Sequence, residues 1–113
     1  MCGFAGTINL NGLDPNKNIE KIMQDALERL HPRGPDQQGK WADKNSYFVH
    51  ARLSIIDTSE RGKQPMKKYN RVLIYNGEIY NFRDLRKKLI NSGYDFSSSS
   101  DCEVLLAGWD KWG

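Results

Sequence analysis

The sequence contains few cysteines and no long apolar run. Its two cysteines, Cys2 and Cys102, lie almost a whole chain length apart, so they do not form the framework of a small disulfide-stabilised protein. The N-terminal region has no basic segment followed by an apolar one, and no apolar run is long enough to span a membrane. We therefore expect free thiols, a cytoplasmic location and no membrane partner.

Patterns for binding nucleotides, nucleic acids and metals are also missing. The chain has neither a Gly-x-Gly-x-x-Gly pattern nor a P-loop. Its 17 Lys and Arg and 14 Asp and Glu give a net charge of +3, with the basic residues scattered rather than gathered into a stripe. Zinc ligands could be drawn from Cys2, His31, His50 and Cys102, but these lack the close pairs of compact zinc modules. We expect no cofactor, metal or nucleic acid in this segment.

The apolar content is sufficient for one small α+β domain. Hydrophobic residues make up 38% of the chain and aromatic residues 11%, which allows a core and argues against disorder. β-Branched and aromatic residues predict strands over 3–10, 46–56 and 71–77. Pro, Gly and polar residues predict loops over 31–40 and 57–70. With helices between these strands, the order predicts a mostly antiparallel sheet covered by helices.

Three helices are expected. The first has six apolar residues at the spacing of one helix face: Ile19, Ile22, Met23, Ala26, Leu27 and Leu30. The second is expected over 82–92 behind an Asn81 N-cap, with an apolar face made of Phe82, Leu85, Leu89 and Ile90. The third should begin near Asp101, because Ser100-x-x-Glu103 has the form of a capping box. The chain stops near the end of this helix, so we expect a fragment of a larger domain with apolar sheet edges exposed.

Cys2 is the first candidate for chemistry. A thiol attacks as the thiolate, so it needs a base, which His31 or His50 could supply. Removal of Met1 would give a second base, because the new α-amine lies on the same residue as the thiol and is partly unprotonated at physiological pH. A lone cysteine of this kind can also be a small buried residue in a strand.

Four further residues have both a functional and a structural interpretation. Asn76 and Gly77 could donate hydrogen bonds to an oxyanion, or they could form a hairpin turn. Arg52 could form a fork around a carboxylate, or it could lie on the surface with an apolar stem. Asp101 needs no role beyond stabilising the first turn of its helix.

Six segments, taken together and in order, resemble the start of a class II glutamine amidotransferase domain of the asparagine synthetase family. They are "MCGFAG" at the start, "RGPDQQG" at 33–39, "RLSIID" at 52–57, "QPM" at 64–66, "NGEIYN" at 76–81 and "SDCEVLLAGWDKWG" at the end. The resemblance covers essentially the whole chain. It implies an N-terminal-nucleophile hydrolase fold, an αββα sandwich of antiparallel sheets that is incomplete at its C-terminus.

The resemblance also implies a reaction and its residues. Glutamine would be hydrolysed to glutamate and ammonia, with Cys2 as the nucleophile and Asn76 and Gly77 as the oxyanion hole. Arg52 would bind the α-carboxylate of glutamine, and Glu78 and Asp101 its α-ammonium group. The pocket would be lined further by the backbone of Leu53, Ser54, Ile55 and Ile56.

Two departures from the family pattern set the remaining expectations. The family has His directly before Arg-Gly-Pro-Asp, whereas Pro32 separates His31 from Arg33 here, which leaves the role of His31 open. The family's glutaminase domain is longer than this chain and is followed by a synthetase domain that uses ATP, magnesium and aspartate. That domain would be a partner in cis, a homodimer is an open question, and the ammonia acceptor would be aspartate or, in a paralogue, another carboxylate. A non-catalytic glutamine-binding remnant is the other alternative.

Overall fold

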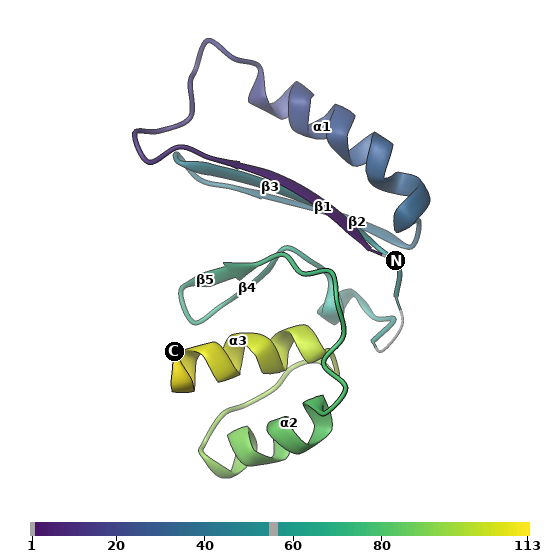
Figure 1. The fold of residues 1–113 in the computed structure, drawn as a ribbon, viewed down its shortest axis with the longest axis vertical. Helices are drawn as coiled ribbons and strands as arrows, with labels where there is room; N and C mark the ends of the chain where they lie inside the picture. The colour runs from purple at the N-terminus through teal and green to yellow at the C-terminus, as the bar shows by residue number, and fades with distance from the viewer. Residues whose placement is uncertain (1, 55–56) are drawn as a thin grey trace.

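Two antiparallel sheets lie between helices in the computed structural model, which describes residues 2–54 and 57–113 (Figure 1). The first sheet contains β1 (Gly3–Ile8), β3 (Ser46–Arg52) and β2 (Gln37–Ala42), in the order β1-β3-β2. The second is the hairpin of β4 (Met66–Lys68) and β5 (Arg71–Leu73). The helices are α1 (Ile19–Leu30), α2 (Phe82–Asn91) and α3 (Asp101–Trp112), and two 3-10 turns span His31–Arg33 and Glu60–Gly62. The α+β prediction with antiparallel sheets is confirmed.

Helix α1 covers the outer face of the three-stranded sheet (Figure 1). The Asn18 side chain caps its first turn by accepting a hydrogen bond from the backbone N–H of Lys21 at 3.1 Å. Met23 and Leu27 on its inner side are buried against Val49 and Ala51 of β3. The helix therefore exists where the apolar spacing predicts it, and its stability comes mostly from this buried face.

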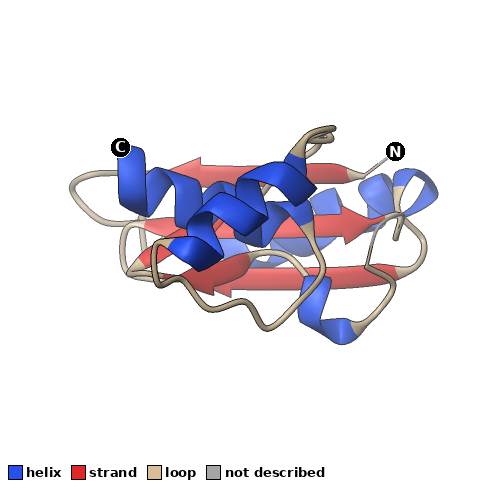
Figure 2. Cartoon of the chain, turned by 90° about the horizontal axis from the view of Figure 1, so that it is seen from below, coloured by secondary structure: helices blue, strands red, loops and turns tan. Residues whose placement is uncertain are grey.

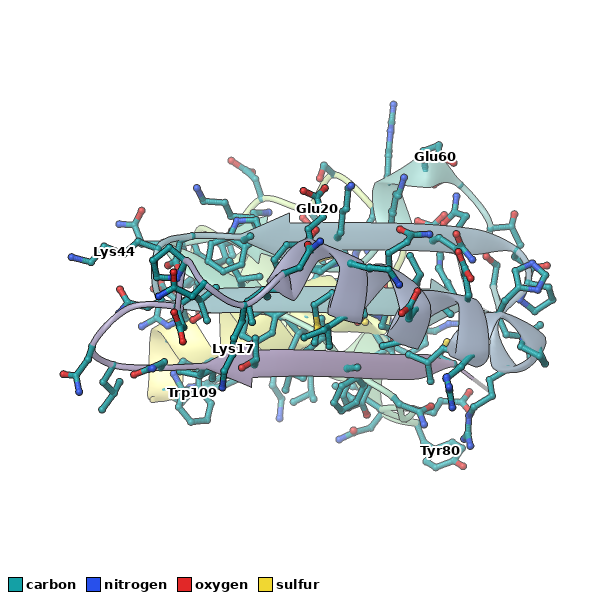
Figure 3. The ribbon with its side chains drawn as sticks, turned by 90° about the horizontal axis from the view of Figure 1, so that it is seen from above. Lys17, Glu20, Lys44, Glu60, Tyr80 and Trp109 are labelled. Atoms are coloured by element: carbon teal, nitrogen blue, oxygen red, sulfur yellow. The ribbon has the colours of Figure 1, made fainter. Side chains whose placement is uncertain are left out.

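The hairpin and the other two helices form the opposite side of the molecule, away from α1 (Figures 1 and 2). Met66 of β4 packs against Cys102 and Leu106 on one face of α3. Another face of α3 packs on α2, with Leu89 and Val104 at the contact. Polar side chains such as Lys44 and Glu60 project into solvent in Figure 3. None of the helices in the described ranges is long and apolar enough to cross a membrane.

Strand β3 separates its residues between the two sides of the first sheet. Val49 and Ala51 face α1, and the alternation of a strand turns His50 and Arg52 to the inner side. The inner face meets the chain before β4 at Gly39 of β2, where an added Cβ would lie 1.8 Å from the carbonyl oxygen of Gln64. Only glycine allows this close approach.

Several sequence predictions are corrected. The 31–40 segment is not all loop, because β2 begins at Gln37 and pairs with β3. The 57–70 segment contains β4, and the strand over 71–77 ends at Leu73. Strand β2 forms by pairing with the distant β3, and β4 forms by pairing with the adjacent β5 as a hairpin, so strand pairing overrides local composition. The strand predicted over 46–56 ends at Arg52, and Ile55 and Ile56 lie outside the described residues.

The helix ends also differ from expectation. Asn81 precedes α2 but its side chain makes no capping hydrogen bond, and Ile90 is 49% exposed rather than part of the apolar face. Ser100 does cap α3, with its Oγ accepting from the N–H of Cys102 at 3.2 Å. Glu103 does not complete a capping box, because its carboxylate binds Lys68 and the segment before Ser100 instead.

The face of the first sheet away from α1 leaves apolar side chains exposed, including Phe4 at 47%.

Candidate active site

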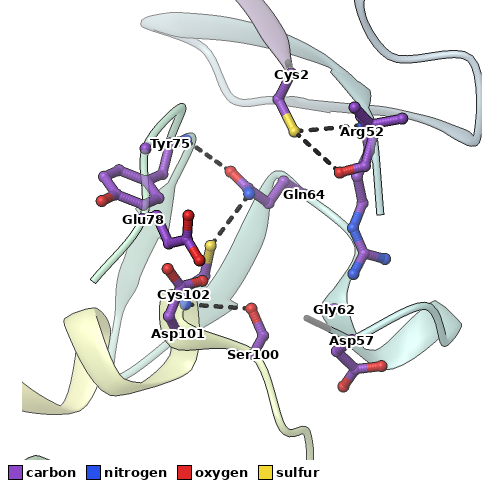
Figure 4. Close-up of a pocket in the computed structure, with 12 residues that line it drawn as sticks. Cys2, Arg52, Asp57, Gly62, Gln64, Tyr75, Glu78, Ser100, Asp101 and Cys102 are labelled. Atoms are coloured by element: carbon purple, nitrogen blue, oxygen red, sulfur yellow. Dashed lines mark hydrogen bonds between the residues drawn. The ribbon is translucent and has the colours of Figure 1, made fainter. Parts of the chain in front are cut away.

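A pocket lies where the C-terminal end of β3, the loop after β5 and the N-terminus of α3 converge (Figure 4). Each of these segments carries polar or charged side chains to one place, although they are far apart in the sequence. The lining residues are Cys2, Arg52, Leu53, Asp57, Gly62, Gln64, Tyr75, Gly77, Glu78, Ser100, Asp101 and Cys102. Six of the residues predicted for the site, including the candidate nucleophile, are therefore brought together.

Cys2 precedes β1 and presents its thiol to the backbone of Leu53. The N–H of Leu53 donates to Sγ at 3.3 Å, and Sγ lies 3.5 Å from the carbonyl oxygen of Leu53 (Figure 4). The residue is only half-buried and lines the pocket, so it differs from a structural core cysteine.

Arg52 is the cation of the pocket, and it is buried, with 6% of its surface exposed. Its Nη1 donates to the side-chain oxygen of Gln37 and to the carbonyl oxygen of Ser59, the latter at 2.9 Å. Gly62 makes room for the guanidinium, because an added Cβ there would lie 2.3 Å from Nη2. These contacts fix the charge and exclude the surface interpretation.

Two predicted anions face the same pocket from different elements. Asp101 opens α3 and is buried, and its Oδ2 accepts a hydrogen bond from the backbone N–H of Ile79 at 3.0 Å. This bond holds the loop that carries Glu78, which is exposed and lines the pocket. Asp101 thus has a contact beyond the helix turn, which local reasoning from its capping position did not provide.

The Asn76-Gly77 pair does not form the turn of a paired hairpin, because β5 ends at Leu73 and α2 follows. Gly77 lines the pocket, and the ring of Tyr75 lies against it: an added Cβ at Gly77 would be 2.6 Å from the Tyr75 hydroxyl. Asn76 is exposed beside this segment and is not among the lining residues.

The "RGPD" segment supports the end of β3. The backbone N–H of Asp36 donates to the carbonyl oxygen of Arg52 at 3.0 Å, and the Asp36 carboxylate accepts from the N–H of Ser54 at 2.7 Å. Ser54 itself is not among the residues that line the pocket. Asp36 therefore fixes the backbone on either side of Leu53, a supporting role that the sequence did not suggest.

The two histidines do not pair with the candidate nucleophile. His31 is exposed in the 3-10 turn after α1. His50 is fully buried, and its Nε2 lies 3.1 Å from the carbonyl oxygen of Tyr75. In the described ranges no three His, Cys, Asp or Glu side chains gather as possible metal ligands.

Sequence reasoning did not assign Asp57, Gln64 or Cys102 to the site, although all three line the pocket. Asp57 binds Ser59 and Ser99, and the hydrogen bond from the Ser59 hydroxyl, at 2.5 Å, lowers its pKa to about 2. Gln64 donates from Nε2 to Cys102 Sγ at 3.1 Å. Burial raises the pKa of the Cys102 thiol to about 12, so this sulfur stays protonated and acts as an acceptor. Only the "QPM" segment gave a signal for Gln64.

The arrangement as a whole suits one kind of ligand. A pocket that holds a buried cation, three carboxylates and a half-buried thiol can bind a small zwitterion at its charged end and present the remainder to sulfur. A family model described as a glutamine amidotransferase domain matches residues 1–113. The chain belongs to the glutamine amidotransferase domain family.

Within this family, the chain is similar to the glutamine-hydrolysing asparagine synthetases. The chain is 41% identical over 109 residues to asparagine synthetase [glutamine-hydrolyzing] 1 of Bacillus subtilis, covering 95% of this chain and 17% of that protein. It is 39% identical over 118 residues to asparagine synthetase B of Escherichia coli, covering 100% and 20%, and 33% identical to an Arabidopsis thaliana asparagine synthetase, covering 100% and 19%. The chain thus spans a fifth or less of the length of these relatives, and matches their N-terminal part.

Proposed function

We propose that this chain is the N-terminal part of an N-terminal-nucleophile hydrolase domain that hydrolyses the side-chain amide of glutamine to glutamate and ammonia. The observation that carries the proposal is the shared pocket, in which the Cys2 thiol faces Arg52, Glu78 and Asp101. The α-carboxylate and α-ammonium groups of glutamine need fixed charges of opposite sign at some distance from the nucleophile. Arg52 supplies the first, and the two carboxylates supply the second.

Binding begins with Arg52. Its Nη1 is used by Gln37 and Ser59, which orient the guanidinium and leave its other N–H groups for the substrate carboxylate. Asp101 keeps Oδ1 for the substrate ammonium while Oδ2 holds the loop of Glu78 through Ile79. The end of glutamine that does not react is thereby held rigidly, which places its amide carbon near sulfur.

The proposed reaction begins at Cys2. After Met1 is removed, the α-amine of Cys2 takes the thiol proton, and Sγ attacks the amide carbon. Asn76 and the backbone N–H of Gly77 stabilise the oxyanion that forms. The protonated amine then gives its proton to the leaving nitrogen, ammonia departs and a thioester remains. Attack by water on the thioester releases glutamate and returns the thiol. Met1 lies outside the described residues.

In the complete protein, we propose that the ammonia serves the ATP-dependent amidation of aspartate to asparagine. The support is the name of the relatives, which are glutamine-hydrolysing asparagine synthetases. A synthetase domain in cis would hold ATP and magnesium, and no residue of this segment is assigned to either.

The test uses protein expressed from the complete reading frame and glutamine labelled with ¹⁵N in its side-chain amide. Wild-type protein should release labelled ammonia and glutamate, and its intact mass should lack Met1. Cys2→Ala should abolish release, because no other side chain replaces the thiol. Lys44→Ala, an exposed change in the β2–β3 turn, is the matched control and should keep full activity. Retained Met1 in an active enzyme, or activity that survives Cys2→Ala, refutes the mechanism. Asparagine formation from aspartate and ATP tests the acceptor separately.

A further inference from the structure

His50 is a buried polar side chain that the proposed chemistry does not use. It lies in β3 opposite Phe4 of β1 and Gly39 of β2, with none of its surface exposed. Its Nε2 is 3.1 Å from the carbonyl oxygen of Tyr75, and within the described ranges its Nδ1 has no hydrogen-bond partner. A buried histidine with one specific contact to another segment calls for an explanation beyond packing.

The contact fixes the protonation of the ring. A carbonyl oxygen only accepts hydrogen bonds, so Nε2 must carry the proton. Burial lowers the pKa of His50; the hydrogen bond to Tyr75 opposes this shift, and the nearby charge of Arg52 adds to it. The ring is therefore neutral at neutral pH, and it is a donor to Tyr75 rather than a base for Cys2.

The Tyr75 peptide groups are held from two sides. The N–H of Tyr75 donates to Oε1 of Gln64 at 2.6 Å, while the carbonyl oxygen accepts from His50 (Figure 4 shows the first of these). Gln64 is 5% exposed, and its amide orientation is set by its bond to Cys102. Tyr75 lies beyond the end of β5 at Leu73, so the side chains of Gln64 and His50 form the hydrogen bonds with its N–H and carbonyl oxygen that a neighbouring strand would otherwise form.

The two hydrogen bonds that hold Tyr75, one from His50 to its carbonyl oxygen and one from its N–H to Gln64, form a clamp next to the proposed oxyanion hole. The carbonyl of Tyr75 belongs to the peptide group that also contains the nitrogen of Asn76, so fixing that plane orients Asn76 and limits where the N–H of Gly77 can point. We propose that His50 is a positioning residue, whose Nε2–H holds the Tyr75 carbonyl so that Asn76 and Gly77 are aimed at the developing oxyanion. This inference rests on the proposed glutamine hydrolysis.

Strand β3 then connects three parts of the reaction through neighbouring residues. Arg52 binds the substrate carboxylate, Leu53 donates to the Cys2 sulfur at 3.3 Å, and His50 orients the oxyanion-binding segment. His50 and Arg52 share the inner face of the strand. Their relative placement is set by one short stretch of backbone, which keeps nucleophile, substrate and oxyanion donors in register.

Two variants separate positioning from packing. His50→Gln keeps a donor, because its side-chain amide N–H can reach the place of Nε2–H. His50→Met fills a similar volume without a donor, and suits an apolar environment better than Gln does. A role in packing alone therefore favours the Met variant, whereas a role in positioning favours the Gln variant.

The variants are compared in protein expressed from the complete reading frame, with folding checked by circular dichroism. His50→Met should lower kcat for glutamine hydrolysis by about tenfold to a hundredfold, with KM changed by less than about threefold, because oxyanion stabilisation acts in the transition state. His50→Gln should retain most of kcat. An unchanged kcat in His50→Met, equal losses in both variants, or a loss confined to KM would overturn the proposal.

A second measurement decides the matter if His50→Met does not fold or if the wild-type protein releases no ammonia. The latter result defeats the proposed function without touching the clamp. In protein labelled with ¹⁵N-histidine, the ring nitrogen shifts of His50 should show a neutral ring with the proton on Nε2. His50→Gln removes these signals and so assigns them. A neutral ring with its proton on Nδ1 rather than on Nε2 would overturn the clamp itself.

Discussion

Replacing Glu103 by Gln should destabilise the fold strongly and remove part of its acid sensitivity. Glu103 is 1% exposed at the start of α3, and its Oε1 lies 2.5 Å from the ammonium of Lys68. Its carboxylate also accepts hydrogen bonds from the backbone N–H groups of Ser97 at 2.9 Å and Ser98 at 2.8 Å. Glu103 thus holds the segment that leads into the pocket residue Asp101.

The magnitude follows from the pKa of Glu103. Burial alone raises this pKa, but the hydrogen bonds from Lys68 and from Ser98 and Ser97 outweigh it and lower the pKa from 4.5 to about 2. Each pKa unit corresponds to about 1.4 kcal/mol, so the charged form contributes about 3 kcal/mol to the free energy of unfolding. Removing one partner of a buried ion pair costs a similar amount, about 3 to 5 kcal/mol.

The pH dependence has a definite sign. Because the folded pKa is depressed, the contribution is fully present above the unfolded pKa of about 4.5 and is lost as the pH falls through the folded pKa of about 2. Within that window the unfolded chain binds a proton that the folded chain does not. The difference between wild type and E103Q should therefore shrink by up to about 1.4 kcal/mol per pH unit.

Urea unfolding of both proteins, followed by tryptophan fluorescence at several pH values between neutral and about 3, measures this difference. Asp57, whose pKa is also about 2, titrates in both proteins, so its contribution cancels. The matched control is E60Q: Glu60 is exposed and lies 3.9 Å from Lys63, so this change should cost less than about 1 kcal/mol. A wild-type to E103Q difference that stays constant as the pH falls from about 5 to about 3 would refute the reasoning.

Three further substitutions probe the pocket and the sheet. Gly62→Ala should raise KM for glutamine by about tenfold, because its Cβ would lie 2.3 Å from Arg52 Nη2 and displace the guanidinium. Circular dichroism should show that this variant is folded, and an unchanged KM would contradict the prediction. Gly39→Ala should lower the free energy of unfolding in urea by more than about 2 kcal/mol, because its Cβ would lie 1.8 Å from the Gln64 carbonyl oxygen, and wild-type stability would show that this contact is wrong. Asp101→Asn keeps the side-chain acceptor while losing the charge, so KM should rise about tenfold or more at unchanged stability; steady-state kinetics showing a normal KM would remove Asp101 from ammonium binding.

The helices could be predicted because their signals are local. The apolar spacing from Ile19 to Leu30 matches α1, and Ser100 marks the start of α3 as expected. Strand β2 could not be found in the same way, since Gln37 to Ala42 are ordinary in composition and become a strand only by pairing with β3. The ion pair of Glu103 could not be predicted for a similar reason, because its partner Lys68 is distant in the sequence.

The residues of the candidate site also differ in whether their signals in the sequence are local. Cys2, Arg52 and Asp101 could be proposed from residue type and motif, and the structure brings them to one pocket. Gln64 and Tyr75 could not, because an amide and a backbone carbonyl become informative only when their partners are known. Motif patterns thus identify the groups proposed to touch substrate, whereas the groups that hold them in place are found from contacts in three dimensions.

The alternation of β3 makes the site intolerant of a change in strand alignment. Val49 and Ala51 form the core with α1, while on the other side of the strand Arg52 lines the pocket and His50 contacts the carbonyl oxygen of Tyr75. A shift of this strand by one residue against its neighbours would exchange the two sets, placing a charge in the core and methyl groups in the pocket. Residues added to or deleted from the 43–45 turn are therefore tolerated only if the change in length stays within the turn and leaves the alignment of β2 with β3 unchanged. In homologous chains, the number of residues in this turn should therefore be conserved even where the total chain length differs.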